Sequence, residues 1–321
     1  MNVDLLIQNL ISPIVLAFLL GMIARWVKSD LEIPDALYQG LSIYLLFAIG
    51  LKGGVALSET ALDVLVTPVL ATIALGIFTP ISAFWILKSL GRLNKIDAAA
   101  TAAHYGSVSA VTFLAATEAT RLAGFEAEGF LPALVAVLEV PGILIGLLLA
   151  RTNRAGGIKA AVHEVLAGKS IFLLVGGMAI GALCGAEKIA TVAPAFIAPF
   201  KGVLCLFLLE LGMVAARRMG DFRKAGIRIA LVGCLLPTFH GILGTAVGIL
   251  IGMNPGGAAV LGAMAGSASY IAAPAAVRIA LPQASPGIYL TLALGVTFPF
   301  NLTVGIPLFL SFAEYFQKLS Q

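Results

Sequence analysis

Charged residues are scarce in this sequence: Asp, Glu, Lys and Arg make up 11% of its 321 residues, whereas hydrophobic residues make up 60%. A soluble domain typically carries about 25% charged residues, so the composition excludes an ordinary soluble enzyme or binding domain. Apolar runs of about 20 residues recur along the whole chain, and the alternating pattern of membrane strands is lacking. The sequence therefore predicts an all-α integral membrane protein.

Residues for metal, redox or nucleophilic chemistry are also few. The three cysteines have no motif spacing, which favours apolar packing, and no second ligand is spaced to join any of the three histidines at a metal. These residues are Cys184, Cys205, Cys234, His104, His163 and His240. We interpret His104 and His240 as hydrogen-bonded packing residues. No HExxH motif or cysteine nucleophile constellation occurs, which argues against a membrane-embedded enzyme. A sensor or scaffold is also disfavoured, because the sequence shows no soluble output domain.

Ten hydrophobic stretches have the length of membrane spans. We place them at 10–27, 34–52, 63–89, 96–122, 128–150, 169–185, 194–215, 224–252, 257–281 and 286–316. No basic segment precedes the first of them, which indicates a retained span and not a cleaved signal. Fifteen of the 20 Lys and Arg fall in the odd-numbered loops. Cytoplasmic loops attract such an excess, so both termini are expected outside the cytoplasm, in a plasma (inner) membrane, and no nucleic-acid partner is needed to explain the charge.

The two halves of the chain look alike. A short basic linker at 151–169 separates residues 1–150 from residues 170–321, and each half holds five predicted spans. Landmark residues recur with near-constant spacing: Gly50 and Gly212, Pro80 and Pro237, Gly106 and Gly266, Pro141 and Pro299. Because five is an odd number, the second repeat is predicted to be inverted, as in many secondary transporters. The alternative is coincidence, since Gly and Pro are common in membrane helices.

The most informative pair of motifs lies in the fourth and ninth spans. They read Gly106-Ser107-Val108-Ser109 and Gly266-Ser267-Ala268-Ser269. Gly and Ser are poor interior helix residues, so both spans are expected to break there and resume at Val108 and Ala268. Unpaired amides at two new helix N-termini can bind a small anion, and the serine hydroxyls can serve an oxyanion or a cation. The alternative is that small residues only allow close helix packing.

Two carboxylates fall inside predicted spans, where charge is costly and usually functional. Glu139 precedes Pro141, and a proline frees a backbone carbonyl one turn earlier, so the pair suggests a hard-cation site. Glu210 is either a transport residue or a protonated helix contact. The predicted sodium ligands are Ser109, Thr112, Glu139, Ser269, Thr297 and Asn301. Arg121 and Arg278, at the far ends of the two broken spans, are expected to snorkel.

Several short motifs, in this order and spacing, resemble one known family. They are Ile49-Gly50-Leu51-Lys52-Gly53-Gly54, Gly106-Ser107-Val108-Ser109, Leu138-Glu139-Val140-Pro141, Gly212-Met213, His240-Gly241 and Gly305-Ile306-Pro307-Leu308-Phe309. The family is that of the cyanobacterial sodium-dependent bicarbonate transporters, the SbtA type. The resemblance implies ten spans, a core domain around two crossed broken helices, a gate domain, a homotrimer surrounded by membrane lipid, and Na⁺-driven uptake of bicarbonate.

Three departures from the family pattern bear on function. The linker is short where the family has a long cytoplasmic insertion, which argues against regulation by a PII-like partner. Tyr270 stands where the family has an acidic residue, and Ala273-Pro274-Ala275 replaces a Gly-Pro-Pro stretch. The expected function is therefore sodium-coupled uptake of a small anion, with bicarbonate favoured. The alternative is another small carboxylate or oxyanion, coupled to sodium or protons, and no organic cofactor is expected.

Overall fold

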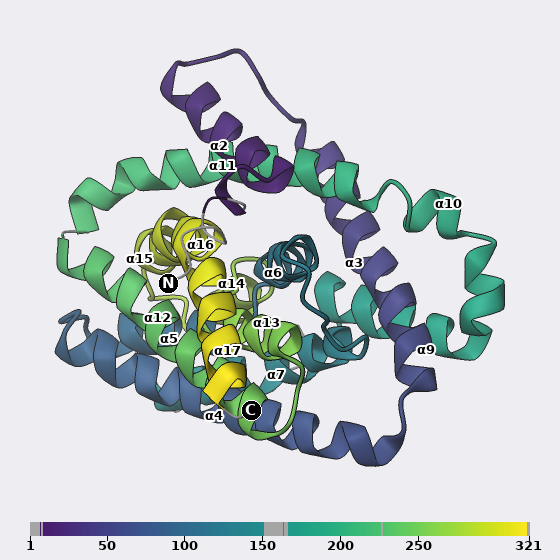
Figure 1. Ribbon diagram of the computed structural model, residues 1–321. Coiled ribbons are helices and arrows are strands. Elements are labelled where there is room, and N and C mark those ends of the chain that lie inside the picture. Colours follow the sequence, from purple (N-terminus) through teal and green to yellow (C-terminus); the bar gives the residue numbers. More distant parts are fainter. Residues whose placement is uncertain (1–6, 8, 151–162, 164–165, 226, 320–321) are drawn as a thin grey trace.

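The computed structural model describes residues 7, 9–150, 163, 166–225 and 227–319, so most of the predicted linker lies outside the described residues. The described part is helical and contains no strand (Figure 1). Its elements are α2 (Pro13–Trp26), α3 (Asp35–Glu59), α4 (Leu62–Ser89), α5 (Lys95–Gly106), α6 (Ala110–Leu122), α7 (Leu131–Leu149), α9 (Lys169–Ala190), α10 (Ala193–Phe196), α11 (Phe200–Ala225), α12 (Ile227–Leu250), α13 (Pro255–Ala265), α14 (Ala273–Ala280), α15 (Pro286–Leu290), η1 (Thr291–Thr297), α16 (Phe298–Phe300), η2 (Asn301–Gly305) and α17 (Ile306–Leu319).

Seven helical segments of the described chain are long and apolar enough to cross a membrane. They are Asp35–Glu59, Leu62–Ser89, Leu131–Leu149, Lys169–Ala190, Ala193–Met219, Ile227–Leu250 and Pro286–Lys318. Pro13–Trp26 and Pro255–Ala265 are shorter apolar helices. The chain is thus a multi-pass helical membrane protein. Every predicted span contains helix, but the count of ten crossings stays a prediction.

Both Gly-Ser motifs interrupt their helices, as the sequence predicts. Helix α5 ends at Gly106, and α6 begins at Ala110 instead of Val108 because Ser109 is its N-cap: the Ser109 side chain accepts a hydrogen bond from the Thr112 amide at 3.2 Å. The second break is longer. Helix α14 begins at Ala273 instead of Ala268, with Pro274 in its first turn, where proline's fixed φ suits a helix start.

The helices fall into two groups. The first halves of the broken helices, α5 and α13, pack with α4, α7, α12 and α17. We call these six helices, together with the second halves α6 and α14, the inner helices. In the second group α2 packs on α11 and α3 packs on α9, and we call these four the outer helices. In Figure 1 the outer helices lie along the top and right of the molecule, while the broken helices lie nearer its centre.

Backbones approach closely where α5 ends. A Cβ added to Gly106 would lie 2.8 Å from the Gly142 Cα of α7, and a Cβ added to Gly142 would collide with the Gly106 carbonyl. The second break shows the same arrangement, since a Cβ on Gly266 would lie 2.6 Å from the Pro237 carbonyl oxygen of α12. Both glycines thus let the broken ends seat against a neighbouring helix.

Gly142→Ala is expected to lower the stability of the folded protein by about 2 kcal/mol or more, because the new methyl group meets backbone atoms that cannot move away. Thermal unfolding in detergent measures the change. Gly176→Ala in α9 is the matched control, since no atom lies within 4 Å of its added Cβ. Equal unfolding temperatures for the two variants would contradict the close contact between α5 and α7.

Candidate functional site

The two breaks are joined directly by hydrogen bonds. The Ser109 amide donates to the Ser267 hydroxyl oxygen at 2.8 Å. The Ser269 amide donates to the carbonyl oxygens of His104, at 2.8 Å, and Ser107, at 3.0 Å. All four serines are buried. Residues that are about 160 positions apart in the sequence therefore form one site, at the point where both broken helices end.

These hydrogen bonds occupy some of the backbone amides that the sequence analysis predicted to be unpaired and to bind a small anion. The amides of Ser109 and Ser269 are occupied, and so are those of Gly266 and Ser267, which donate to carbonyls of α13. Among the described residues, no hydrogen bond is formed by the N–H groups of Val108 and Ala268. Both residues are only 2% exposed. The expectation of unpaired amides thus holds at the central position of each motif and is wrong for the others named here.

His104 holds the second break in place. Its ring Nδ1 donates to the Ser269 carbonyl oxygen at 2.6 Å, and its own carbonyl accepts from the Ser269 amide at 2.8 Å. The ring also stacks on Tyr289, with centroids 4.5 Å apart. A carbonyl only accepts, so Nδ1 carries the proton. His104 is therefore a hydrogen-bonded packing residue, as predicted, although the sequence did not indicate its partner.

His240 joins two unbroken inner helices. Its ring Nε2 lies 2.7 Å from the Ser82 hydroxyl, which links α12 to α4. No group of three or more His, Cys, Asp or Glu in the described residues is arranged to hold a metal ion. The polar groups of the breaks are hydroxyls, backbone amides and carbonyls, with the His104 ring beside them, and such groups can bind a small anion or an alkali cation.

Two of the predicted sodium ligands lie in the π-helical turns of the last span, a feature frequent at functional sites. The Thr297 hydroxyl donates to the Gly233 carbonyl at 2.8 Å and lies 2.6 Å from the Tyr105 hydroxyl at the end of α5. The Asn301 amide nitrogen donates to the Gly266 carbonyl at 2.8 Å. Its oxygen Oδ1 is buried without a partner in the described structure. Asn301 therefore brings a free acceptor beside the second break.

The remaining candidates are placed differently. Thr112 is buried on the first turn of α6, where Ser109 caps its amide. Glu139 is 3% exposed on α7, and no hydrogen bond or ion pair joins it to another described residue. It lies one turn before Gly142, whose backbone touches Gly106. Residues three apart share a helix face, so Glu139 lies on the face of α7 that packs against the first break.

Glu210 is not part of this site. It lies on the outer helix α11, where its carboxylate oxygen is 3.0 Å from the Arg217 guanidinium. An ion pair along its own helix replaces the protonated helix contact that the sequence suggested, while the alternative of a transport carboxylate stays a prediction. The sequence could have indicated this pair, since residues seven apart return to the same helix face.

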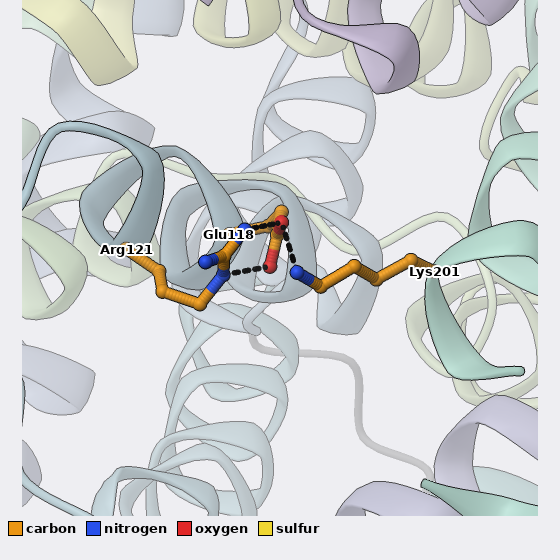
Figure 2. Close-up of polar contacts among 3 residues, drawn as sticks. All are labelled: Glu118, Arg121 and Lys201. Atoms are coloured by element: carbon orange, nitrogen blue, oxygen red, sulfur yellow. Dashed lines mark hydrogen bonds and ion pairs between the residues drawn. The ribbon is translucent and has the colours of Figure 1, made fainter. Parts of the chain in front are cut away.

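An ion-paired cluster links the inner and outer helices (Figure 2). Glu118 of α6 accepts from Arg121 at 2.7 and 2.9 Å, and its Oε1 lies 3.0 Å from the Lys201 ammonium of α11. Arg121 was expected only to snorkel, so this pairing is a correction, and the sequence did not single out Glu118. The Lys201 side chain is 53% exposed, and exposed pairs typically contribute at most about 1 kcal/mol, so this cluster does not by itself hold the two groups together.

Comparison with known proteins identifies the family. A search of curated proteins found no match. The sequence model of one protein family, described as the Na⁺-dependent bicarbonate transporter superfamily, matches residues 13–314. That range includes both Gly-Ser motifs and nearly every described helix. The chain therefore belongs to the Na⁺-dependent bicarbonate transporter superfamily.

Proposed function

We propose that this protein is a sodium-coupled symporter of a small anion, with bicarbonate favoured, and that the anion binds where the two breaks meet. The observation that carries the proposal is the pair of buried, unpartnered N–H groups at Val108 and Ala268. A buried donor without a partner costs free energy that a bound oxyanion would recover. The first N–H groups of α6 add the positive end of a helix dipole.

An inverted repeat explains why these donors come in pairs. The Ser109 amide donates to the Ser267 hydroxyl oxygen, and the Ser269 amide donates to the Ser107 carbonyl oxygen. In the first bond the donor is residue 109 and the acceptor residue is 267. Adding the repeat offset of 160 to the donor gives residue 269, and subtracting it from the acceptor gives residue 107, which are the donor and acceptor residues of the second bond. The residue positions of the two bonds are thus related by exchange of the halves, although one acceptor is a hydroxyl and the other a backbone carbonyl. This supports ten spans in two inverted repeats, residues 1–150 and 170–321, joined by the linker at 151–169.

A second pair of contacts supports the same symmetry. Helices α5 and α13 begin after Asn94 and Asn254, which are also 160 positions apart. Near the start of α5, Asp97 accepts from the Ser285 amide at 2.7 Å. At the start of α13, the Asn254 amide donates to Glu128 at 2.6 Å. The first half of each broken helix, α5 or α13, is thus tied to the loop that follows the second half of the other broken helix.

Sodium binding fits the oxygen atoms that remain beside the breaks. Hard cations take carboxylate, carbonyl and hydroxyl oxygens. Asn301 Oδ1 and the Glu139 carboxylate are buried without hydrogen-bond partners in the described residues, and the Ser109 and Ser269 hydroxyls lie in the breaks themselves. We assign the sodium ligands to this group, with Thr112 adjacent. Thr297 is a weaker candidate because its hydroxyl already has two partners.

The second candidate keeps the fold and changes the cargo to another small carboxylate or oxyanion, coupled to sodium or protons. Tyr270, in place of the family's acidic residue, favours it because a phenol changes both the charge and the size of the site. The remaining proposals rest on the distribution of basic residues and on the family: both termini outside the cytoplasm, an inner-membrane location and a homotrimer.

Uptake into liposomes tests the function. Purified protein is reconstituted, and labelled bicarbonate uptake is measured with an inward Na⁺ gradient, without it, and with a pH gradient in its place. The proposal expects uptake that depends on Na⁺ and is not inhibited by excess acetate, pyruvate, nitrate or sulfate. Transport of one of those anions, and not of bicarbonate, would establish the second candidate. No uptake of any of them under either gradient would overturn both.

A further inference from the structure

We infer that Tyr270 is an anion-binding residue whose hydroxyl adds a third donor to the site, and that its ring, with Phe298 and Phe18, forms the wall that seals the site toward the outer helix α2. The inference rests on the proposed anion site. It goes further because it assigns a donor from a side chain that neither Gly-Ser motif contains, and because it names the residues that close the site.

Tyr270 is placed for this role by its position in the second break. It follows Ser269 directly, in the segment between α13 and α14, and it is 9% exposed. Its hydroxyl oxygen is buried and lies near the Ser109 side chain, but the geometry falls short of a hydrogen bond. Buried phenols normally find a partner, so this hydroxyl is free to bind a ligand at the junction of the breaks.

The ring of Tyr270 is the first in a series of aromatic contacts that extends from the second break to helix α2. Its centroid lies 5.6 Å from that of Phe298 in α16, at an interplanar angle of 73°. Phe298 meets Phe18 of α2 at 5.3 Å and 75°. Both are edge-to-face contacts, the favoured geometry for aromatic pairs. Phe18 and Phe298 are fully buried, so the three rings exclude water between the break and α2.

A second aromatic pair supports this wall from α3. Tyr38 lies near Tyr270, and it stacks on Phe207 of α11 with centroids 4.8 Å apart and rings 7° from parallel. The stacked pair Tyr38 and Phe207 thus joins α3 to α11 on the side of the outer helices. Opening a path to the site from the side of α2 must separate Phe18 from Phe298, because that contact joins the outer helix α2 to α16.

The chemistry of this site defines the ligand class. The donors are two backbone N–H groups and one phenol, and all three are neutral. A site built from neutral donors behind an aromatic wall favours a small, flat oxyanion, such as a bicarbonate or a short carboxylate. It disfavours bulky or multiply charged anions, since neither break, at 106–109 and 266–272, contains a Lys or Arg to balance a second charge.

The hydroxyl is tested by Tyr270→Phe, which keeps the ring and removes one donor. We expect KM for bicarbonate to rise about tenfold with kcat little changed, because a lost hydrogen bond weakens binding by about that factor. Tyr44→Phe is the matched control, since its hydroxyl bonds to the Ala195 carbonyl between α3 and α10 and should leave KM unchanged. An unchanged KM for Tyr270→Phe would overturn the binding role.

The wall is tested by the accessibility of the site. In a background without Cys184, Cys205 and Cys234, Ser107→Cys places a thiol in the first break, where the native hydroxyl is buried without a partner. Adding Phe298→Ala is expected to raise the rate at which a small charged thiol reagent modifies this residue at least tenfold. An equal rate with and without Phe298→Ala would overturn the wall.

Failure of the inference about Tyr270 can be told apart from failure of the proposed function. Protection of the introduced thiol by bicarbonate reports anion binding without requiring transport. If bicarbonate protects the thiol but Tyr270→Phe leaves KM unchanged, the anion site stands and the role of Tyr270 is wrong. If neither bicarbonate nor the other small anions protect it, and the wild type shows no uptake, the proposed function itself is wrong.

Discussion

Replacing Ser109 with leucine is expected to reduce anion uptake at least a hundredfold while the protein still folds. Ser109 is buried between the breaks, where its amide meets Ser267 and its side chain caps α6. A leucine fills that space with three additional carbon atoms and removes the cap, so an anion can no longer reach the Val108 and Ala268 amides. Ser269→Leu is expected to act in the same way from the second break.

Uptake into liposomes measures the effect, and size-exclusion profiles and unfolding temperatures show that folding is retained. Ser109→Ala is the matched variant because it keeps the space and removes only the hydroxyl. Its uptake should fall by about tenfold at most, and stability should drop by about 1 kcal/mol through loss of the cap. Wild-type uptake by a folded Ser109→Leu protein would remove Ser109 from the anion site.

The positions of the breaks could be predicted because they depend on local chemistry. Glycine and serine weaken a helix wherever they cluster, whatever packs around them. The restart points could not be predicted as well, since Ala110 follows from the capping choice of Ser109 and Ala273 from the proline that comes next. Lengths and apolar character likewise placed most helices near their observed ranges, although the seventh predicted span, 194–215, covers two helices, α10 and α11, of which α11 continues to Ala225.

The pairing of groups within the site was beyond local reasoning. Whether an amide is free depends on which distant atom reaches it: the Ser267 hydroxyl accepts from the Ser109 amide, and the carbonyls of His104 and Ser107 accept from that of Ser269. His104 and Glu118 acquire their roles in the same way, from partners on other helices. Motif symmetry could have suggested that Val108 and Ala268 are equivalent, but not that both of their amides are left unpaired.

Glu139→Gln is expected to raise the Na⁺ concentration for half-maximal uptake about tenfold or more. The substitution keeps the shape of the side chain and removes its charge. Glu139 is buried on α7 with no hydrogen bond or ion pair to another described residue. A carboxylate within a membrane helix without a partner is costly, so a bound cation or a proton must compensate its charge, and the sodium proposal assigns that role to Na⁺. A glutamine oxygen binds Na⁺ more weakly because only its dipole remains.

The measurement is a Na⁺ titration of bicarbonate uptake at fixed pH, with the maximal rate determined separately. Glu126→Gln, an exposed residue in the loop before α7, is the control and should leave the Na⁺ dependence unchanged. If Glu139→Gln also leaves it unchanged while a Na⁺ gradient still drives uptake, Glu139 is a packing residue and the cation depends on Asn301 and the serine hydroxyls. If a pH gradient drives uptake in the wild type and fails in Glu139→Gln, the coupling ion is a proton and Glu139 carries it.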